Sequence, residues 1–173
     1  MKPSNKISPL FGSIKQLIEQ SKRNVAVSVN AEITMLYWNV GNAIHKEILG
    51  EQRAEYGKQV IATLSAQLEE EYGKGWSAEQ LRHCLRIAEA FPEKQIVYTL
   101  CTQLSWSHLR ILIFMDDPLK RDFYIEMCKL EKWSVRTFRE RVNSMLYERT
   151  AISKKPEETI KQQFKETKNK PRY

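Results

Sequence analysis

The chain has 173 residues, of which 28 are lysine or arginine and 21 are acidic, so its formal net charge is +7. The hydrophobic share of 42% is enough for the core of one domain, while the low content of glycine (6) and proline (6) disfavours a β-sandwich or barrel. No apolar run approaches the roughly 18 residues of a membrane span, and no apolar region follows the first residues as in a secretion signal. We therefore expect a cytoplasmic, largely helical protein without a membrane segment.

The three cysteines, Cys84, Cys101 and Cys128, are widely spaced, and none belongs to a C-x-x-C pair. This pattern predicts neither a disulfide framework nor a zinc site, and it fits a reducing compartment. We expect reduced thiols in the core, and neither a metal ion nor a cofactor.

The N-terminal part predicts two helices, residues 9–22 and 24–49, or one helix that runs through both. The second range carries an apolar stripe at three- and four-residue steps, which consists of Val25, Val29, Ile33, Leu36, Val40, Ile44 and Ile48. Gly41 interrupts this range. Since glycine in a helix interior usually lowers stability, it indicates a place where another helix comes close.

Residues 56–71 and 77–90 predict two amphipathic helices joined by a short turn that contains Gly73 and Gly75. Such a pair is typical of a helix-turn-helix, although any hairpin of two helices gives the same pattern. The second helix is predicted to bury Leu81, Cys84, Leu85, Ala88 and Phe91. Its exposed face is predicted to carry Glu79, Arg82, His83, Arg86 and Glu89.

Tryptophan followed by serine opens three predicted helices, at Trp76-Ser77, Trp106-Ser107 and Trp133-Ser134. In each pair the serine suits the N-cap, where its hydroxyl accepts a hydrogen bond from a free backbone N–H of the first turn. The tryptophan would then be buried against an apolar residue four positions into the helix, as in a hydrophobic staple. The expected partners are Leu81, Ile111 and Phe138.

Residues 93–104 fit either a short helix or a short strand, and a strand here would make the domain winged. Beyond them, helices are predicted at residues 107–115, 118–131 and 134–149, the second of which is capped by Asp117 and has proline in its first turn. The fold class is therefore an all-α domain of six to eight helices, with a small β-wing as the alternative.

The expected domain covers residues 1–150. Residues 151–173 hold seven basic and three acidic side chains, and thus +4 of the net charge of +7. This composition predicts a basic C-terminal tail or linker that favours polyanions.

Basic side chains occur at several places that would suit contact with DNA. Arg82 and Arg86 lie one turn apart on the predicted exposed face, from which guanidinium groups reach phosphates or guanine edges, and His83 lies beside them. The other candidate DNA-binding residues are Lys132, Arg136, Arg139, Lys154 and Lys155. The simpler interpretation is a solvated face on which the arginines pair with Glu79 and Glu89, which contributes little to stability.

Ser105, Ser107 and His108 could suggest a nucleophile and its base, but the sequence places no carboxylate to orient the histidine. Both serines are better explained as helix caps. We therefore expect no catalytic residue in this chain.

Several short motifs, in a characteristic order, resemble the N-terminal domain of the YhcG-like bacterial nucleases over roughly residues 10–160. These motifs are Leu36-Tyr37-Trp38-Asn39-Val40-Gly41, Tyr56-Gly57-Lys58, Leu104-Ser105-Trp106-Ser107-His108, Asp117-Pro118 with Arg121 and Phe123-Tyr124, Trp133-Ser134-Val135-Arg136, Leu146-Tyr147-Glu148-Arg149 and Ser153-Lys154-Lys155-Pro156. The pair His83-Cys84 departs from the resemblance, because an aromatic and a large apolar residue are expected there.

The resemblance implies a helical domain that precedes a nuclease domain of the PD-(D/E)xK type in full-length members. The catalytic carboxylates and lysine would belong to that second domain, so none is carried over to this chain, which is either a piece of a longer protein or a short member. The hypothesis is a DNA-binding or targeting module of a nuclease, non-catalytic by itself. The alternative is a helical oligomerisation or protein-interaction module that does not contact DNA.

Overall fold

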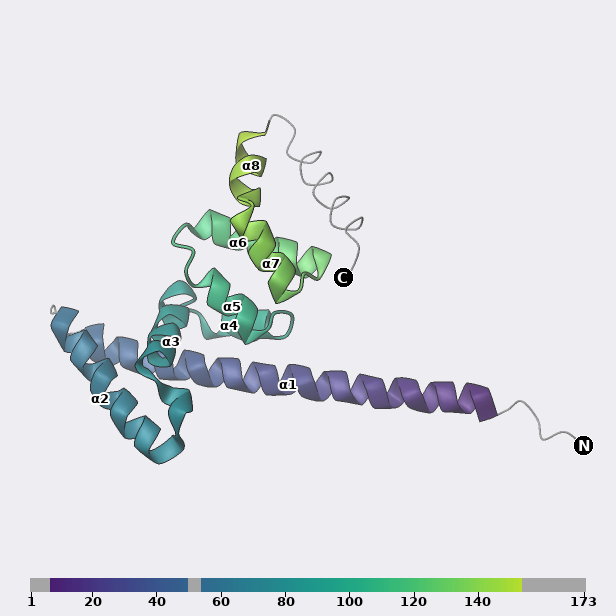
Figure 1. The fold of residues 1–173 in the computed structure, drawn as a ribbon, viewed down its shortest axis with the longest axis horizontal. Coiled ribbons are helices and arrows are strands. Elements are labelled where there is room, and N and C mark those ends of the chain that lie inside the picture. Colours follow the sequence, from purple (N-terminus) through teal and green to yellow (C-terminus); the bar gives the residue numbers. More distant parts are fainter. Residues whose placement is uncertain (1–6, 50–53, 154–173) are drawn as a thin grey trace, which may run out of the picture. The chain divides into compact units, whose positions relative to one another are not determined.

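The computed structural model describes residues 7–49 and 54–153, and within these ranges the protein is built from helices (Figure 1). The elements in chain order are α1 (Ile7–Leu49), α2 (Ala54–Tyr72), the short 3-10 helix η1 (Lys74–Trp76), α3 (Ala78–Ala90), α4 (Lys94–Cys101), α5 (Trp106–Leu112), α6 (Pro118–Glu131), α7 (Val135–Asn143) and α8 (Leu146–Ile152). The prediction of an all-α domain with six to eight helices is confirmed.

The alternative of a β-wing is wrong, because the segment that fitted either a helix or a strand forms α4 and the described ranges contain no strand. Val97, Leu100 and Cys101 are the buried residues of α4. They follow a helical rather than an alternating spacing, so a strand would have turned part of this set to solvent.

The chain forms two compact units, Met1–Ile113 and Phe114–Tyr173. The helices α1 to α5 belong to the first unit, and α6 to α8 belong to the second. The expected division into a domain of residues 1–150 and a tail of residues 151–173 stays a prediction, because residues 154–173 lie outside the described residues.

In the first unit, α1 is one continuous helix of 43 residues, so the two predicted N-terminal helices are joined without a break. Its C-terminal part packs on α3 and α4. Gly41 lies where α1 crosses α3, since a β-carbon at this position would be only 1.6 Å from the carbonyl oxygen of Cys84. The predicted close approach of another helix at Gly41 is therefore confirmed.

Two aromatic residues of α1 fix its position against the rest of the first unit. Trp38 is buried, and its indole Nε1 donates a hydrogen bond of 2.8 Å to the carbonyl oxygen of Phe91, at the end of α3. The ring of Tyr37 lies between those of Trp76 and Trp106, with centroid distances of 6.0 and 4.7 Å. One turn of α1 thus contacts η1, the first residue of α5 and the end of α3.

Asn30 joins α1 to the loop between α4 and α5 through three hydrogen bonds. Its Nδ2 donates to the carbonyl oxygens of Cys101 at 2.9 Å and Leu104 at 3.0 Å, and its Oδ1 accepts from the backbone N–H of Trp106 at 3.0 Å. Backbone groups at helix ends lack partners within their own helix. One side chain of α1 therefore satisfies the end of α4 and the start of α5.

The pair α2 and α3 shares with α1 an apolar core around the buried residues Ile44 of α1, Ile61 of α2 and Leu81 of α3. The turn between the helices contains Gly73 at φ 87°, a left-handed conformation in which glycine is favoured, and then η1. Ser77 caps α3 by accepting a hydrogen bond of 3.3 Å from the N–H of Gln80. The predicted pair of helices and its connecting turn are therefore present.

The three Trp-Ser motifs have different outcomes. Ser77 and Ser134 cap α3 and α7 as predicted, and Trp76 packs against the apolar core that contains Leu81. The prediction that Ser107 is an N-cap, with Trp106 before it, is wrong, because α5 begins at Trp106 itself and its N-cap is Ser105. Ser105 forms a capping box with His108, and Asn30 accepts the N–H of Trp106 in this first turn. Of the three tryptophans, Trp133 is buried, whereas Trp76 and Trp106 are half-buried.

The second unit is organised around Tyr124 of α6, Phe138 of α7 and Leu146 of α8, which are all fully buried. The rings of Tyr124 and Phe138 lie 5.6 Å apart between centroids. The Tyr124 hydroxyl donates to the carbonyl oxygen of Arg141 at 3.4 Å and accepts from the N–H of Tyr147 at 3.3 Å. Asp117 caps α6 as predicted, by accepting a hydrogen bond of 2.9 Å from the N–H of Leu119.

Candidate nucleic-acid interface

The outer face of α3 presents Arg82 and Arg86, and both side chains are exposed as predicted. The opposite face of α3 is buried against the first unit through Leu81, Cys84, Ile87 and Ala88. This apolar face packs on α1 and α2, which fixes the orientation of α3 within the first unit. The two arginines therefore project away from the core.

The prediction that His83 lies on the exposed face is wrong, since its side chain is only 5% exposed. α5 packs against α3 and brings the charge of Arg110 to His83, and the exposed face of α3 is narrower than the sequence indicates. Burial lowers the pKa of His83, and the positive charges of Arg110 and Arg86 lower it further, while Glu79 opposes this effect. The ring is therefore neutral near pH 7. Its Nε2 lies 4.0 Å from Glu79 Oε1.

Arg110 of α5 is a basic residue of this region that the sequence did not reveal as a candidate. Its side chain is exposed, and its positive charge acts on His83 of α3, so its guanidinium lies on the side of α3 that carries His83. We call Arg82, Arg86 and Arg110 the α3–α5 basic cluster. A sequence signal for Arg110 was present, because Arg110 and His108 are the polar exceptions in an otherwise apolar segment. Only the packing of α5 on α3, however, brings Arg110 close to α3.

The second unit carries the other candidates, Lys132, Arg136 and Arg139, which are all exposed. Lys132 ends α6 in a left-handed conformation at φ 50°. Arg136 Nε lies 3.2 Å from Glu140 Oε1, and an exposed pair of this kind contributes little to stability. Lys154 and Lys155 lie outside the described residues.

A fourth basic residue of this region, Arg141, has a different environment from its neighbours. Its side chain is buried, and its guanidinium carbon lies 5.8 Å from the centre of the Trp133 ring. A guanidinium at this distance from an indole ring is attracted by the electron density of the ring. Arg141 is therefore part of the packing of α7, in contrast to the exposed Arg136 and Arg139.

Ser105 and His108 are brought together, with 2.7 Å between Ser105 Oγ and His108 Nδ1. The same nitrogen accepts the backbone N–H of Ser105 at 3.3 Å, which makes the pair a capping box at the start of α5. This geometry explains both side chains as a helix cap, as expected from the sequence.

The cysteines lie in the core, and burial raises the pKa of Cys84 and of Cys128 to about 12. Their thiols are therefore protonated at neutral pH and are poor nucleophiles. In the described part of the chain, no three His, Cys, Asp or Glu residues gather in a way that could hold a metal ion.

A protein family described as the DUF1016 N-terminal domain matches residues 13–149, which is most of the chain. The chain belongs to this family. A curated relative, "Putative nuclease YhcG" of Escherichia coli (strain K12), is 27% identical over 177 residues, a match that covers 83% of this chain and 46% of the relative. The chain thus spans about half the length of that relative, and the resemblance to the N-terminal domain of YhcG-like proteins is confirmed.

No solved structure matches the chain. Among the helices of residues 7–49 and 54–153, none has both the length and the apolar character needed to cross a membrane.

Proposed function

We propose that this DUF1016 N-terminal domain binds DNA and thereby serves as the targeting module of a nuclease, in the cytoplasm and without catalytic activity of its own. The observation that carries the proposal is the α3–α5 basic cluster, Arg82, Arg86 and Arg110, exposed on two packed helices. The name of the curated relative and the net charge of +7 also support DNA binding.

In this proposal α2, η1 and α3 act as a helix-turn-helix in which α3 faces the nucleic acid. Arg82 and Arg86 lie one turn apart, and each guanidinium can contact a phosphate or the edge of a guanine. Phosphate contacts release condensed counterions from DNA, so they give affinity without selecting a sequence. Catalysis would belong to a PD-(D/E)xK domain, as the family resemblance implies for full-length relatives.

The decisive experiment reverses the charge of Arg82 and Arg86 together, as Arg82→Glu and Arg86→Glu. Both side chains are exposed, so the variant should fold, which circular dichroism would check. Two favourable phosphate contacts become repulsive, and we expect affinity for a labelled duplex to fall roughly tenfold or more. The slope of log K against log salt should also become shallower, by about 2.

The matched control is Lys46→Glu with Lys94→Glu, which changes the net charge by the same amount on two exposed residues of the first unit that are not DNA-binding candidates. A loss of affinity confined to the α3 variant supports the proposal. If both variants lose affinity equally, the effect is one of total charge. Unchanged binding of the α3 variant at every salt concentration contradicts the role of α3.

A second expectation concerns residues 151–173, which carry +4 of the net charge of +7 and include Lys154 and Lys155. If this segment follows DNA phosphates, its removal should weaken binding and make the salt dependence shallower. Fluorescence anisotropy of the shortened chain, measured from low to physiological salt, would test this. An unchanged affinity and salt slope would remove the tail from the interface.

The alternative function, a helical interaction module that does not contact DNA, is favoured by a different observation. The N-terminal part of α1 exposes large apolar side chains, among them Phe11 at 67% and Leu17 at 70%. Exposed apolar surface of this extent often marks a site of protein association.

A further inference from the structure

The exposed side of α1 carries one continuous row of residues that is apolar with a single exception. Its members are Phe11, Ile14, Ile18, Lys22, Val25, Val29, Ile33 and Leu36. All of the apolar members are exposed, from 40% for Ile33 to 67% for Phe11. At about 100° per residue, the row occupies one face of the helix.

Over residues 11–36 this row points away from the side of α1 that packs on α3 and α4, and beyond Leu36 the same face continues into Val40, Ile44 and Ile48, which are part of the apolar core shared with α2. The side that packs on the other helices carries Asn30, Thr34, Trp38 and Gly41. On a helical wheel these residues lie roughly opposite the centre of the row. Within the first unit, Figure 1 shows the N-terminal part of α1 extending beyond the other helices. A second helix could therefore lie along the row without meeting α3 or α4.

The spacing of the row is the same in both directions along the chain. The successive steps from Phe11 to Leu36 are three, four, four, three, four, four and three residues. A two-fold symmetric contact requires that residue i meets residue j while residue j meets residue i. In an antiparallel pair centred between Arg23 and Asn24, Phe11 would meet Leu36, Ile14 would meet Ile33, and Ile18 would meet Val29. The row is therefore complementary to itself.

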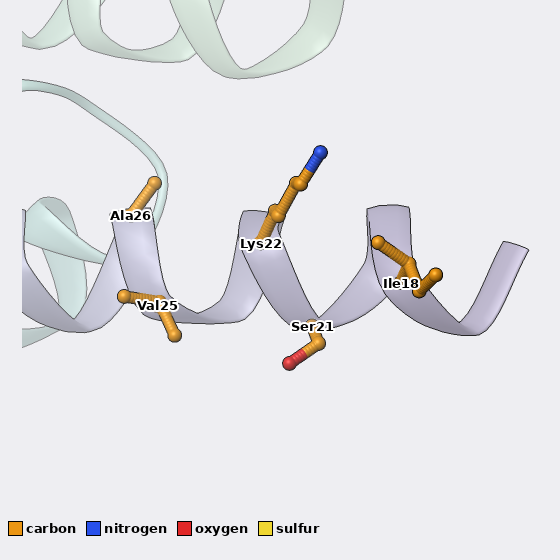
Figure 2. A pocket seen from close by; sticks show the side chains of 5 residues that line it. All are labelled: Ile18, Ser21, Lys22, Val25 and Ala26. Carbon is orange, nitrogen blue, oxygen red and sulfur yellow. The ribbon is translucent and has the colours of Figure 1, made fainter. Parts of the chain in front are cut away.

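Lys22 is the polar exception, and it would lie opposite Val25 at the centre of the pair. Its ammonium is 3.2 Å from Glu19 Oε1 on the same helix, which directs the charge to the side of the row. Figure 2 shows Lys22 projecting away from Ser21, in a shallow surface pocket that Ile18, Val25 and Ala26 also line. The aliphatic part of lysine can cover apolar surface while its charge stays in water, so Val25 of the second helix can pack on it.

The row extends over a long part of α1. Its eight members lie along residues 11–36, which form about seven turns or about 38 Å of helix. The steps of three, four and four residues repeat every eleven residues, a period that gives nearly straight helices with a weak right-handed supercoil. A straight helix such as α1 can therefore keep the row in contact along its whole length.

We propose that α1 pairs with α1 of a second copy of this chain, as an antiparallel two-fold dimer centred between Arg23 and Asn24. The inference does not depend on DNA binding, because the row and the α3–α5 basic cluster involve different residues. In the dimer, α3 and α4 of one copy would lie toward the opposite end of the helix pair from α3 and α4 of the other copy. In each copy these helices pack on the C-terminal part of α1.

Sedimentation velocity of the whole chain over a range of concentrations would test the association. We expect a dimer that the substitution Val29→Glu dissociates, because the carboxylate would face Ile18 of the other copy without a partner. The matched control is Val27→Glu, the same change two residues away on α1, off the row, where the side chain is 45% exposed. A chain that stays monomeric throughout overturns the proposal, as does equal dissociation by both variants.

Disulfide formation tests the antiparallel register. Ile18→Cys and Val29→Cys in the same chain should form covalent dimers on mild oxidation, because the two positions face each other between copies. Either substitution alone should not, since the two equivalent positions would lie eleven residues apart, about 17 Å along the helix. The native cysteines are buried, and the unsubstituted chain gives the background on a non-reducing gel. Covalent dimers from each single variant would indicate parallel helices and reject the register.

Discussion

Replacing Gly41 by alanine is expected to destabilise the protein by about 3 kcal/mol, at the upper end of the usual cost of overpacking. The added β-carbon would lie 1.6 Å from the carbonyl oxygen and 2.3 Å from the carbonyl carbon of Cys84. Both atoms belong to the backbone of α3, so no side chain can rotate away, and α1 must move off α3. The better helix propensity of alanine, about 1 kcal/mol, offsets only part of this cost.

Gly12→Ala is the matched control, because Gly12 lies on the same helix and a β-carbon there would meet no atom within 4 Å. This variant should be unchanged or slightly more stable, by up to about 1 kcal/mol. Urea unfolding followed by circular dichroism and tryptophan fluorescence would compare the two. Equal stability of the Gly41 and Gly12 variants would show that the two helices do not meet at this close distance.

The sequence predicted the helices well where the signals are local. Asp117 before Pro118 is a cap followed by a proline in the first turn, and α6 begins at Pro118 as expected. The same holds for Ser77 and Ser134, whose hydroxyls accept hydrogen bonds from the first turns of α3 and α7. Each of these starts depends on residues within four positions of one another, which a reading of the chain can recognise.

Other features depend on contacts between distant residues and could not be read from one stretch of sequence. The N–H of Trp106 in the first turn of α5 is accepted by Asn30 of α1, although 76 residues separate them. His83 has the position of an exposed residue on its own helix, but it is buried in the folded unit, where α5 packs on α3. Periodicity describes one helix at a time, so it does not say from which side a second helix will pack.

The candidate site also combines residues that one helix reveals with a residue that only the packing of two helices reveals. Arg82 and Arg86 were found from the sequence because both lie on the polar face of one helix, and that face is exposed. Arg110 was missed because its part in the α3–α5 basic cluster arises only when α5 packs on α3. The charge-reversal variants of Arg82 and Arg86 distinguish a DNA contact from a solvated face of paired charges.

In the second unit, Phe138→Ala is expected to have the largest effect, a loss of about 3–5 kcal/mol in the stability of that unit. Phe138 is fully buried, and its ring lies 5.6 Å from that of Tyr124, which is also fully buried. Removing the ring leaves a cavity beside Tyr124, whose hydroxyl connects α6 to the backbone at Arg141 and Tyr147. The surroundings of the cavity are therefore restrained and can collapse only partly, so the cost should lie in the upper part of this range.

Leu130→Ala on α6 is the appropriate control, because it also removes a large apolar side chain, but one that is 71% exposed. It should change stability by no more than about 0.5 kcal/mol, as is usual for surface substitutions. Hydrogen exchange of the α6, α7 and α8 amides would detect the difference directly in this unit. Equal protection in the two variants would mean that Phe138 does not hold these helices together, and that the core of the unit lies elsewhere.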